Sequence, residues 1–204
     1  MKRNIGIVIL VISILWILHT FSKNFITDPS FESFIARKDQ ILTDKNLWIS
    51  LIRNHIVLAL ISLITGPLGI IKAIRSKSKT FHRWNGRLYM LSIVLNFIPG
   101  IYVSFFATGG LLSTIGFLIL NSLWLVTTLL GFYYIRRRNV KLHSQWITRS
   151  FFLSFANIAI YIITAISHHL MKVAYEHSYI IAVWLSWMLT LIAAEFMIRK
   201  RMFV

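Results

Sequence analysis

Two segments of the sequence bring together side chains that are suited to hold a cofactor. Each segment lies just before a long apolar run and combines histidine, tryptophan and arginine. The residues are His82, Trp84 and Arg87 in the first segment and His143, Trp146 and Arg149 in the second. Neutral imidazole ligates haem iron and borderline metals, whereas guanidinium groups pair with carboxylates and phosphates. The pattern predicts that His82 and His143 ligate a metal ion or the iron of a haem b. Arg87 and Arg149 are expected to meet the haem propionates or another anionic headgroup.

The sequence lacks the groups that several other kinds of site require. It contains no cysteine, which excludes disulfides, thiol catalysis, iron–sulfur clusters and c-type haem attachment. No carboxylate lies in the middle of an apolar run, and Glu195 lies near the end of the last one. A hydrolase triad would have no acidic member there, and a proton-coupled pump would lack its usual carboxylate. Whether the chain is an enzyme stays open.

The elements that must position these residues are strongly apolar. Of the 204 residues 57% are hydrophobic, and the mean hydropathy is +0.71, more apolar surface than a soluble domain of this size buries. The net charge of +16 comes from short cationic clusters between apolar runs, a distribution typical of membrane topology signals rather than nucleic-acid binding. The expected partners are the lipid bilayer and its anionic headgroups, with no nucleic acid. A membrane-protein partner stays open.

Six apolar runs are long enough to cross a bilayer as helices. They cover residues 5–21, 47–71, 84–106, 111–135, 146–166 and 179–198. The sequence therefore predicts an all-α, polytopic membrane protein with a single integral membrane domain over residues 1–204. Gly66-Pro67 in the second span and Pro99-Gly100 in the third are expected to produce kinks or close helix contacts.

The distribution of charge predicts the orientation of the spans. The first span follows a basic start and shows no signal-peptide cleavage site, so we expect an uncleaved helix with a cytoplasmic N-terminus. Six spans then place both termini in the cytoplasm of a cell whose plasma membrane holds the protein. The outer segments carry only six of the 22 Lys and Arg residues, namely Lys23, Arg37, Lys38, Lys45, Arg53 and Lys172. Because spans three and five run in the same direction, His82 and His143 are expected to enter the membrane from the cytoplasmic face at matching depth.

The one sizeable polar segment follows the first span. Asp28-Pro29 has the pattern of a helix cap followed by proline at the first helical position. Apolar residues then recur at helical spacing, which predicts an amphipathic helix over residues 28–42 lying on the outer interface. A loosely ordered loop is the alternative.

His55 lies in the outer part of the second span. It is a candidate cofactor-binding residue, but it lies about a membrane thickness from His82 and His143, so one metal bound by all three is not expected. A second, outer site that combines it with His168 or His169 stays open.

Two asparagines repeat the spacing of the two motif histidines. Asn96 lies 14 residues after His82, and Asn157 lies 14 residues after His143. In a continuous helix this spacing is nearly four whole turns, so each amide would share a face with its histidine. Both are expected to face the bundle interior and to bond between helices.

From about His55 to Tyr161 the sequence resembles the predicted bacterial membrane proteins grouped as domain of unknown function 2306. The residues that carry the resemblance are His55, Gly66-Pro67, His82-Arg-Trp84, Gly86-Arg87, Tyr89, Gly116-Phe117, Trp124, His143, Trp146 and Arg149-Ser150. The resemblance implies a helical membrane fold and points to the three histidines. It supplies no established activity.

Three functions are compatible with these sequence features. The first is a b-type haem-binding redox or electron-transfer protein that uses His82 and His143 at the cytoplasmic face. The second is a non-catalytic protein for scaffolding, assembly or lipid interaction, which needs no nucleophile or acid–base pair. The third is a small-solute carrier that uses the proline positions and the central asparagines.

Overall fold

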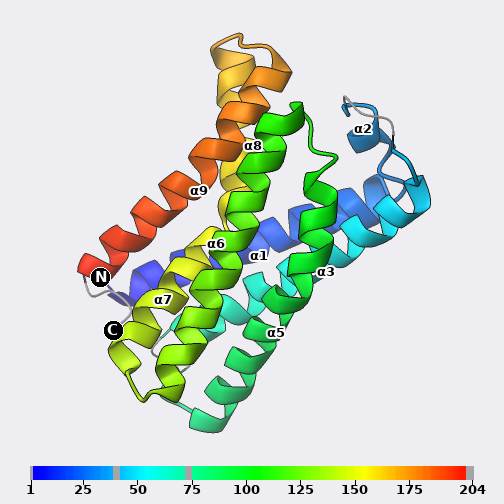
Figure 1. The fold of residues 1–204 in the computed structure, drawn as a ribbon. Coiled ribbons are helices and arrows are strands. Elements are labelled where there is room, and N and C mark those ends of the chain that lie inside the picture. The colour runs from blue at the N-terminus through cyan, green and yellow to red at the C-terminus, as the bar shows by residue number, and fades with distance from the viewer. Residues whose placement is uncertain (1, 39–41, 72–74, 201–204) are drawn as a thin grey trace.

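The computed structural model describes residues 2–38, 42–71 and 75–200. Within these ranges the chain is helical and contains no strand, which confirms the all-α prediction. The spans form an elongated bundle in which successive helices run in alternating directions (Figure 1).

Six helices are long and apolar enough to cross a membrane, as predicted. They cover Ile5–Thr27, Lys45–Ile70, Lys79–Ser104, Gly110–Arg136, Val140–Leu170 and Tyr175–Arg199. The first combines α1 (Lys2–Phe21) with a π-helix, η1 (Ser22–Thr27); the next three are α3 (Lys45–Ile70), α5 (Lys79–Ser104) and α6 (Gly110–Arg136). The fifth combines α7 (Val140–Leu153), α8 (Ala156–Ala165) and a second π-helix, η2 (Ile166–Leu170), and the last is α9 (Tyr175–Arg199).

Polar side chains fix where three of these helices begin. The Asp44 carboxylate accepts the first free backbone N–H groups of α3, the Ser78 hydroxyl accepts one at the start of α5, and the Asn139 side chain accepts one at the start of α7. Such caps satisfy donors that have no partner within the helix. The turn before α6 depends on Gly109, whose φ of 85° favours glycine, and it joins α5 and α6 as an antiparallel hairpin.

The two proline positions produce close helix contacts, one of the two outcomes expected of them. Both prolines lie inside continuous helices, Pro67 in α3 and Pro99 in α5. A Cβ added to Gly66 would lie 2.2 Å from the Phe151 ring, and one added to Gly100 would lie 2.7 Å from Asn121 Oδ1. Glycine at these sites therefore lets α7 approach α3 and α6 approach α5.

The fifth span is interrupted where the sequence shows neither glycine nor proline. The backbone N–H groups of Ser154 and Phe155 bond three residues back, to Phe151 and Phe152, in place of the α-helical four. The side chains of α8 are therefore rotated about the helix axis relative to the positions that a continuous helix would give them. As a result Asn157 is exposed, whereas Asn96 in the unbroken α5 is buried. The predicted interior position of Asn96 is confirmed, although its side-chain amide has no well-formed hydrogen bond within the described residues. The prediction for Asn157 is wrong because it assumed one continuous helix.

The polar segment after the first span is folded differently from the predicted amphipathic helix. Among the described residues of the predicted segment 28–42, the one helix is α2 (Glu32–Ile35), preceded by Phe31 with a φ of 56°. Phe34 stacks on the Trp48 ring of α3, and Phe31 meets the same ring in a T-shaped contact. Phe31 and Trp48 are almost completely buried. Packing against α3 has therefore replaced a longer helix. Residues 39–41 of the predicted segment lie outside the described residues.

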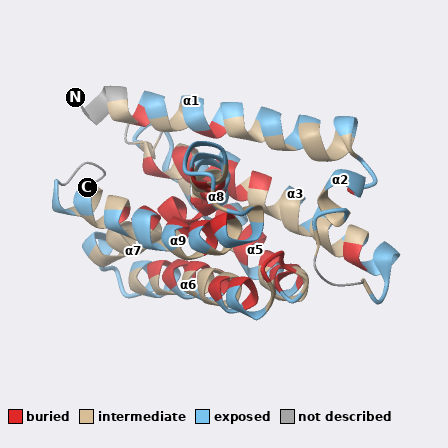
Figure 2. Ribbon diagram, turned by 90° about the horizontal axis from the view of Figure 1, so that it is seen from above, coloured by how far each residue is buried: buried red, intermediate tan, exposed pale blue. Residues whose placement is uncertain are grey.

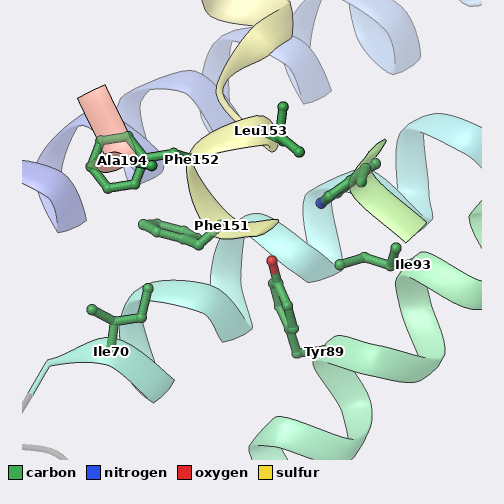
Figure 3. Packing of buried hydrophobic residues seen from close by; sticks show 8 residues of the cluster. Ile70, Tyr89, Ile93, Phe151, Phe152, Leu153 and Ala194 are labelled. Carbon is green, nitrogen blue, oxygen red and sulfur yellow. The ribbon is translucent and has the colours of Figure 1, made fainter. Parts of the chain in front are cut away.

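The buried core is centred on the end of α7. Its cluster is made of Ile70, Tyr89, Ile93, Trp124, Phe151, Phe152, Leu153 and Ala194, which come from α3, α5, α6, α7 and α9 and converge in Figure 3. Seen from above, α1 runs along one side of the molecule with a largely exposed outer face, and α6 lies on the opposite side (Figure 2). α1 is thus the peripheral helix of the bundle.

Candidate functional site

The two motif histidines occupy equivalent places at the start of α5 and of α7. His82 lies four residues after the cap residue Ser78, and its backbone N–H bonds to the Ser78 carbonyl at 3.1 Å. His143 lies four residues after the cap residue Asn139 and makes the same bond at 3.0 Å. Both side chains therefore leave the last part of the first helical turn. The structure brings the two rings close enough for their charges to act on each other.

The ring of His143 is fixed by a backbone carbonyl of α6. Its Nδ1 lies 2.8 Å from the Gly131 carbonyl oxygen. Because a carbonyl only accepts, Nδ1 carries the proton and Nε2 keeps its lone pair. Gly131 also sets how closely α7 approaches, since a Cβ there would lie 2.6 Å from Ile147. The ring is thus held in one tautomer and orientation, with a free nitrogen on its other side.

His82 carries an unsatisfied ring nitrogen. Its Nδ1 is buried and has no hydrogen-bond partner within the described chain. Arg75, in the connection between α3 and α5, acts electrostatically on both His82 and His143. We call His82, His143 and Arg75 the histidine cluster. Arg75 was not among the predicted site residues; its only signal in the sequence is its place in a short basic loop before the first motif.

The motif arginines lie elsewhere on their helices. The guanidinium of Arg87 lies 4.7 Å from the centre of the Trp84 ring, and Arg149 lies 4.5 Å from that of Trp146. Arg149 also forms an ion pair with Glu195 of α9, with Nε 2.5 Å from Oε1. Five residues separate His82 from Arg87, which places them on different faces of α5. The expected role of both arginines toward an anion remains a prediction, and Glu195 already balances the charge of Arg149.

His55 forms a separate polar site inside the bundle. Its side chain interacts with that of Asn96, while its buried Nδ1 has no ideally placed partner within the described residues. Asn96 lies 14 residues after His82, so the His55 site is about 21 Å along α5 from the histidine cluster. The expectation that His55 does not share a metal with the other two histidines agrees with this distance. In the described part of the chain no group of three metal-ligating side chains is found.

His168 and His169 contact each other in η2. Their ring centres lie 4.9 Å apart, and His168 Nδ1 lies 2.9 Å from the Val173 carbonyl oxygen. The edge of Tyr175 completes this contact. His55 has Asn96 as its neighbour instead, so the outer site that would combine it with His168 or His169 remains a prediction.

Several other residues that carry the family resemblance meet in one buried hydrogen-bond network. The Tyr89 hydroxyl lies 2.7 Å from Ser150 Oγ, which lies 2.7 Å from Thr128 Oγ1. The indole of Trp124 lies beside the same tyrosine hydroxyl. The network joins α5, α6 and α7. Tyr89 and Ser150 lie about two helical turns after His82 and His143. Reasoning from the sequence missed it because hydroxyl groups within apolar runs carry no periodic signal.

Asn85 makes a second contact between helices near the cluster. Its amide donates to the Thr65 carbonyl of α3 at 2.7 Å. An added Cβ at Gly69 would lie 3.3 Å from the Asn85 amide, so the small residue leaves room for this bond. The first turns of α5, which carry His82, are thereby held against α3.

Comparison with known proteins agrees with this architecture. A family model described as a predicted membrane protein, DUF2306, matches residues 52–198. No curated protein and no solved structure shows a significant match to the chain. The matched region contains His55, His82 and His143, the hydroxyl network and all or most of five of the six spans. The chain is a multi-pass membrane protein and belongs to the DUF2306 family.

Proposed function

We propose that this protein binds a haem b between the first turns of α5 and α7 and transfers electrons, and that His82 and His143 would hold its iron. The observation that carries the proposal is the equivalence of the two histidines. Each follows its cap residue by four positions, and the two rings act on each other electrostatically. Bis-histidine ligation needs one imidazole from each of two neighbouring helices.

The residues of the histidine cluster fit an iron ligand set. A ligating histidine usually donates its other ring N–H to a carbonyl or carboxylate, which fixes the tautomer. His143 already does so through Gly131, and this leaves Nε2 available. His82 has an unsatisfied buried nitrogen, which a bound group or its water would satisfy.

Arg75 is a candidate to meet a haem propionate. It acts on both histidines, whereas Arg149 is paired with Glu195. Charge-assisted bonds from guanidinium to carboxylate are strong and directional. The bound haem would supply one-electron redox chemistry, and the protein's part is to hold, orient and shield it.

The test is the visible spectrum of protein purified from haem-supplied cells. Wild type is expected to show a Soret band, and His82→Ala and His143→Ala are each expected to lose it. His177→Ala is the matched control, because His177 is an exposed histidine near the start of α9, and it should keep the band. A wild type without the band, or a band that survives both substitutions in the cluster, would rule out this site.

The same cluster supports a second, non-catalytic function, in which it holds an anionic lipid headgroup. The supporting observations are that Arg75 acts electrostatically on both histidines and that the buried Nδ1 of His82 has no partner in the described chain, because a phosphate accepts bonds from a guanidinium and from an imidazole N–H. Under this alternative the purified protein shows no Soret band. Arg75→Gln would then lower the retention of phosphatidylglycerol by protein released from nanodiscs, measured by native mass spectrometry.

A further inference from the structure

A groove opens between α1, the α7–α8 junction and α9. Its volume is about 260 Å³, and it is lined by Ile9 and Ile12 of α1, Phe152 and Phe155 at the junction, and Leu189 and Ala193 of α9, with Thr190 beside them. The Thr190 hydroxyl donates to the Ser186 carbonyl at 2.9 Å, so its hydrogen-bond donor is already satisfied. Ile12 is 43% exposed and Leu189 is 48% exposed. The groove therefore faces the lipid, within the spans.

One face of α1 leads from this groove to the end of the first span. Ile9, Ile12, Trp16, His19 and Lys23 recur every three or four residues, so they lie on the same side of the helix. The outer three of them contact one residue of α8. Trp16 and His19 have ring centres 5.2 and 6.1 Å from that of Tyr161, and Lys23 Nζ donates to the Tyr161 hydroxyl at 3.1 Å.

Asn157 lies between the groove and Tyr161 on α8. It is exposed, and its side-chain amide makes no hydrogen bond with another residue of the described chain. It precedes Tyr161 by one turn, about 6 Å, on the same face of the helix. An amide that faces acyl chains without a partner is costly. Its exposure next to an apolar groove points to a ligand that offers a hydrogen-bond acceptor at this depth.

Lys23 adds a cation at the membrane edge. An ammonium group has three donors, and the Tyr161 hydroxyl takes only one. The charges of Lys23 and the Asp28 carboxylate act on each other, but no ion pair between them is found among the described residues. Asp28 is itself bonded to the Ser33 hydroxyl and to the backbone of Glu32 and Ser33. The ammonium therefore retains donors for an external anion.

From these observations we propose that one anionic phospholipid binds along α1 and α8. One acyl chain lies in the groove, an ester carbonyl accepts from Asn157, and the phosphate meets Lys23. Along the protein the apolar groove comes first, then the Asn157 amide and then the Lys23 ammonium. A phospholipid presents its acyl chain, ester and phosphate in the same order. A neighbouring transmembrane helix would fill the groove but would leave the amide and the ammonium unpaired, which favours the lipid. This inference does not depend on the histidine cluster.

The test is native mass spectrometry of the whole protein released from nanodiscs with equal phosphatidylglycerol and phosphatidylcholine. Wild type should retain one phosphatidylglycerol in preference to phosphatidylcholine. Lys23→Gln should reduce that preference about fivefold, as expected for one basic residue near a bilayer surface. Lys172→Gln is the matched control, because this exposed cation lies in the loop before α9, and it should behave as wild type.

Two further substitutions separate the other parts of the site. Asn157→Leu should lower retention of both lipids, and Ala193→Phe, which fills the groove, should do so more strongly. Equal retention of the two lipids by wild type would overturn the proposal, as would unchanged preference in Lys23→Gln. Cysteine at Ile12, introduced into a chain that has none, should form no disulfide between copies in the nanodisc. Efficient dimer formation would show that a second copy occupies the groove.

Discussion

At the scale of single residues, the residues that carry the family resemblance have three different structural roles. His82 and His143 form the cluster, Tyr89 and Ser150 form the hydroxyl network, and the glycines allow the helices to meet. Gly66 shows the third task most clearly, because its missing side chain is the space that the Phe151 ring occupies. Lipid provides no hydrophobic force between helices, so such close packing is a main source of stability within a membrane.

Gly66→Ala is therefore expected to destabilise the protein by about 1–3 kcal/mol, the usual cost of overpacking. The new methyl group would lie 2.2 Å from a ring that is fully buried. Gly86→Ala is the control, since a Cβ there meets nothing within 4 Å, and alanine in a helix is favoured over glycine by about 0.5–1 kcal/mol. Denaturation in mixed micelles measures both. Equal stability of the two variants would contradict the packing argument.

At the scale of elements, the fifth span departs most from what its sequence indicates. Its apolar run predicts one helix, yet two backbone bonds of the shorter type separate α7 from α8. Tertiary packing explains the difference. Phe151, Phe152 and Leu153, the last residues of α7, are all buried in the core, and the break follows directly after them. The break also turns Asn157 outward, where the sequence alone predicts an interior amide.

The short helix α2 allows a prediction about pH. The Ser33 hydroxyl donates to Asp28, and with the N–H groups of Glu32 and Ser33 it holds the pKa of that carboxyl below its ordinary value. Because the folded pKa is lower than the unfolded one, this stabilisation is present above the unfolded pKa and is lost as the pH falls through the folded pKa. The ¹³C shift of the Asp28 carboxyl should report the low pKa in wild type. Ser33→Ala should raise it, and an unchanged pKa would show that the hydroxyl contributes nothing.

At the scale of the whole molecule, the sequence predicts the number of spans, their approximate ends and the two motif histidines. These follow from hydropathy, capping residues and side-chain chemistry, which are local. The pairing of helices is not local. The approach of α7 to α3 at Gly66, the place of Arg75 beside the histidines and the ion pair of Arg149 with Glu195 depend on which faces meet. No single-sequence pattern specifies those faces.

The orientation of the bundle remains to be measured. Figure 1 shows both termini toward the side where α6 connects to α7, and the charge distribution predicts that this side is cytoplasmic. The outer segments carry only six of the 22 Lys and Arg residues, and translocating short basic loops is unfavourable. Three exposed positions can report the topology, Ser30 before α2, Ser76 before α5 and His177 at the start of α9.

Single cysteines at these positions give a clean readout, since the natural chain contains none. In intact cells an impermeant maleimide is expected to label Ser30→Cys and His177→Cys, while Ser76→Cys should react only after the membrane is permeabilised. Permeabilised cells also control for reactivity, because all three should then be labelled. The opposite pattern, with Ser76→Cys alone labelled from outside, would invert the topology. It would place the histidine cluster at the external face, so that its redox partner or lipid would have to come from that side.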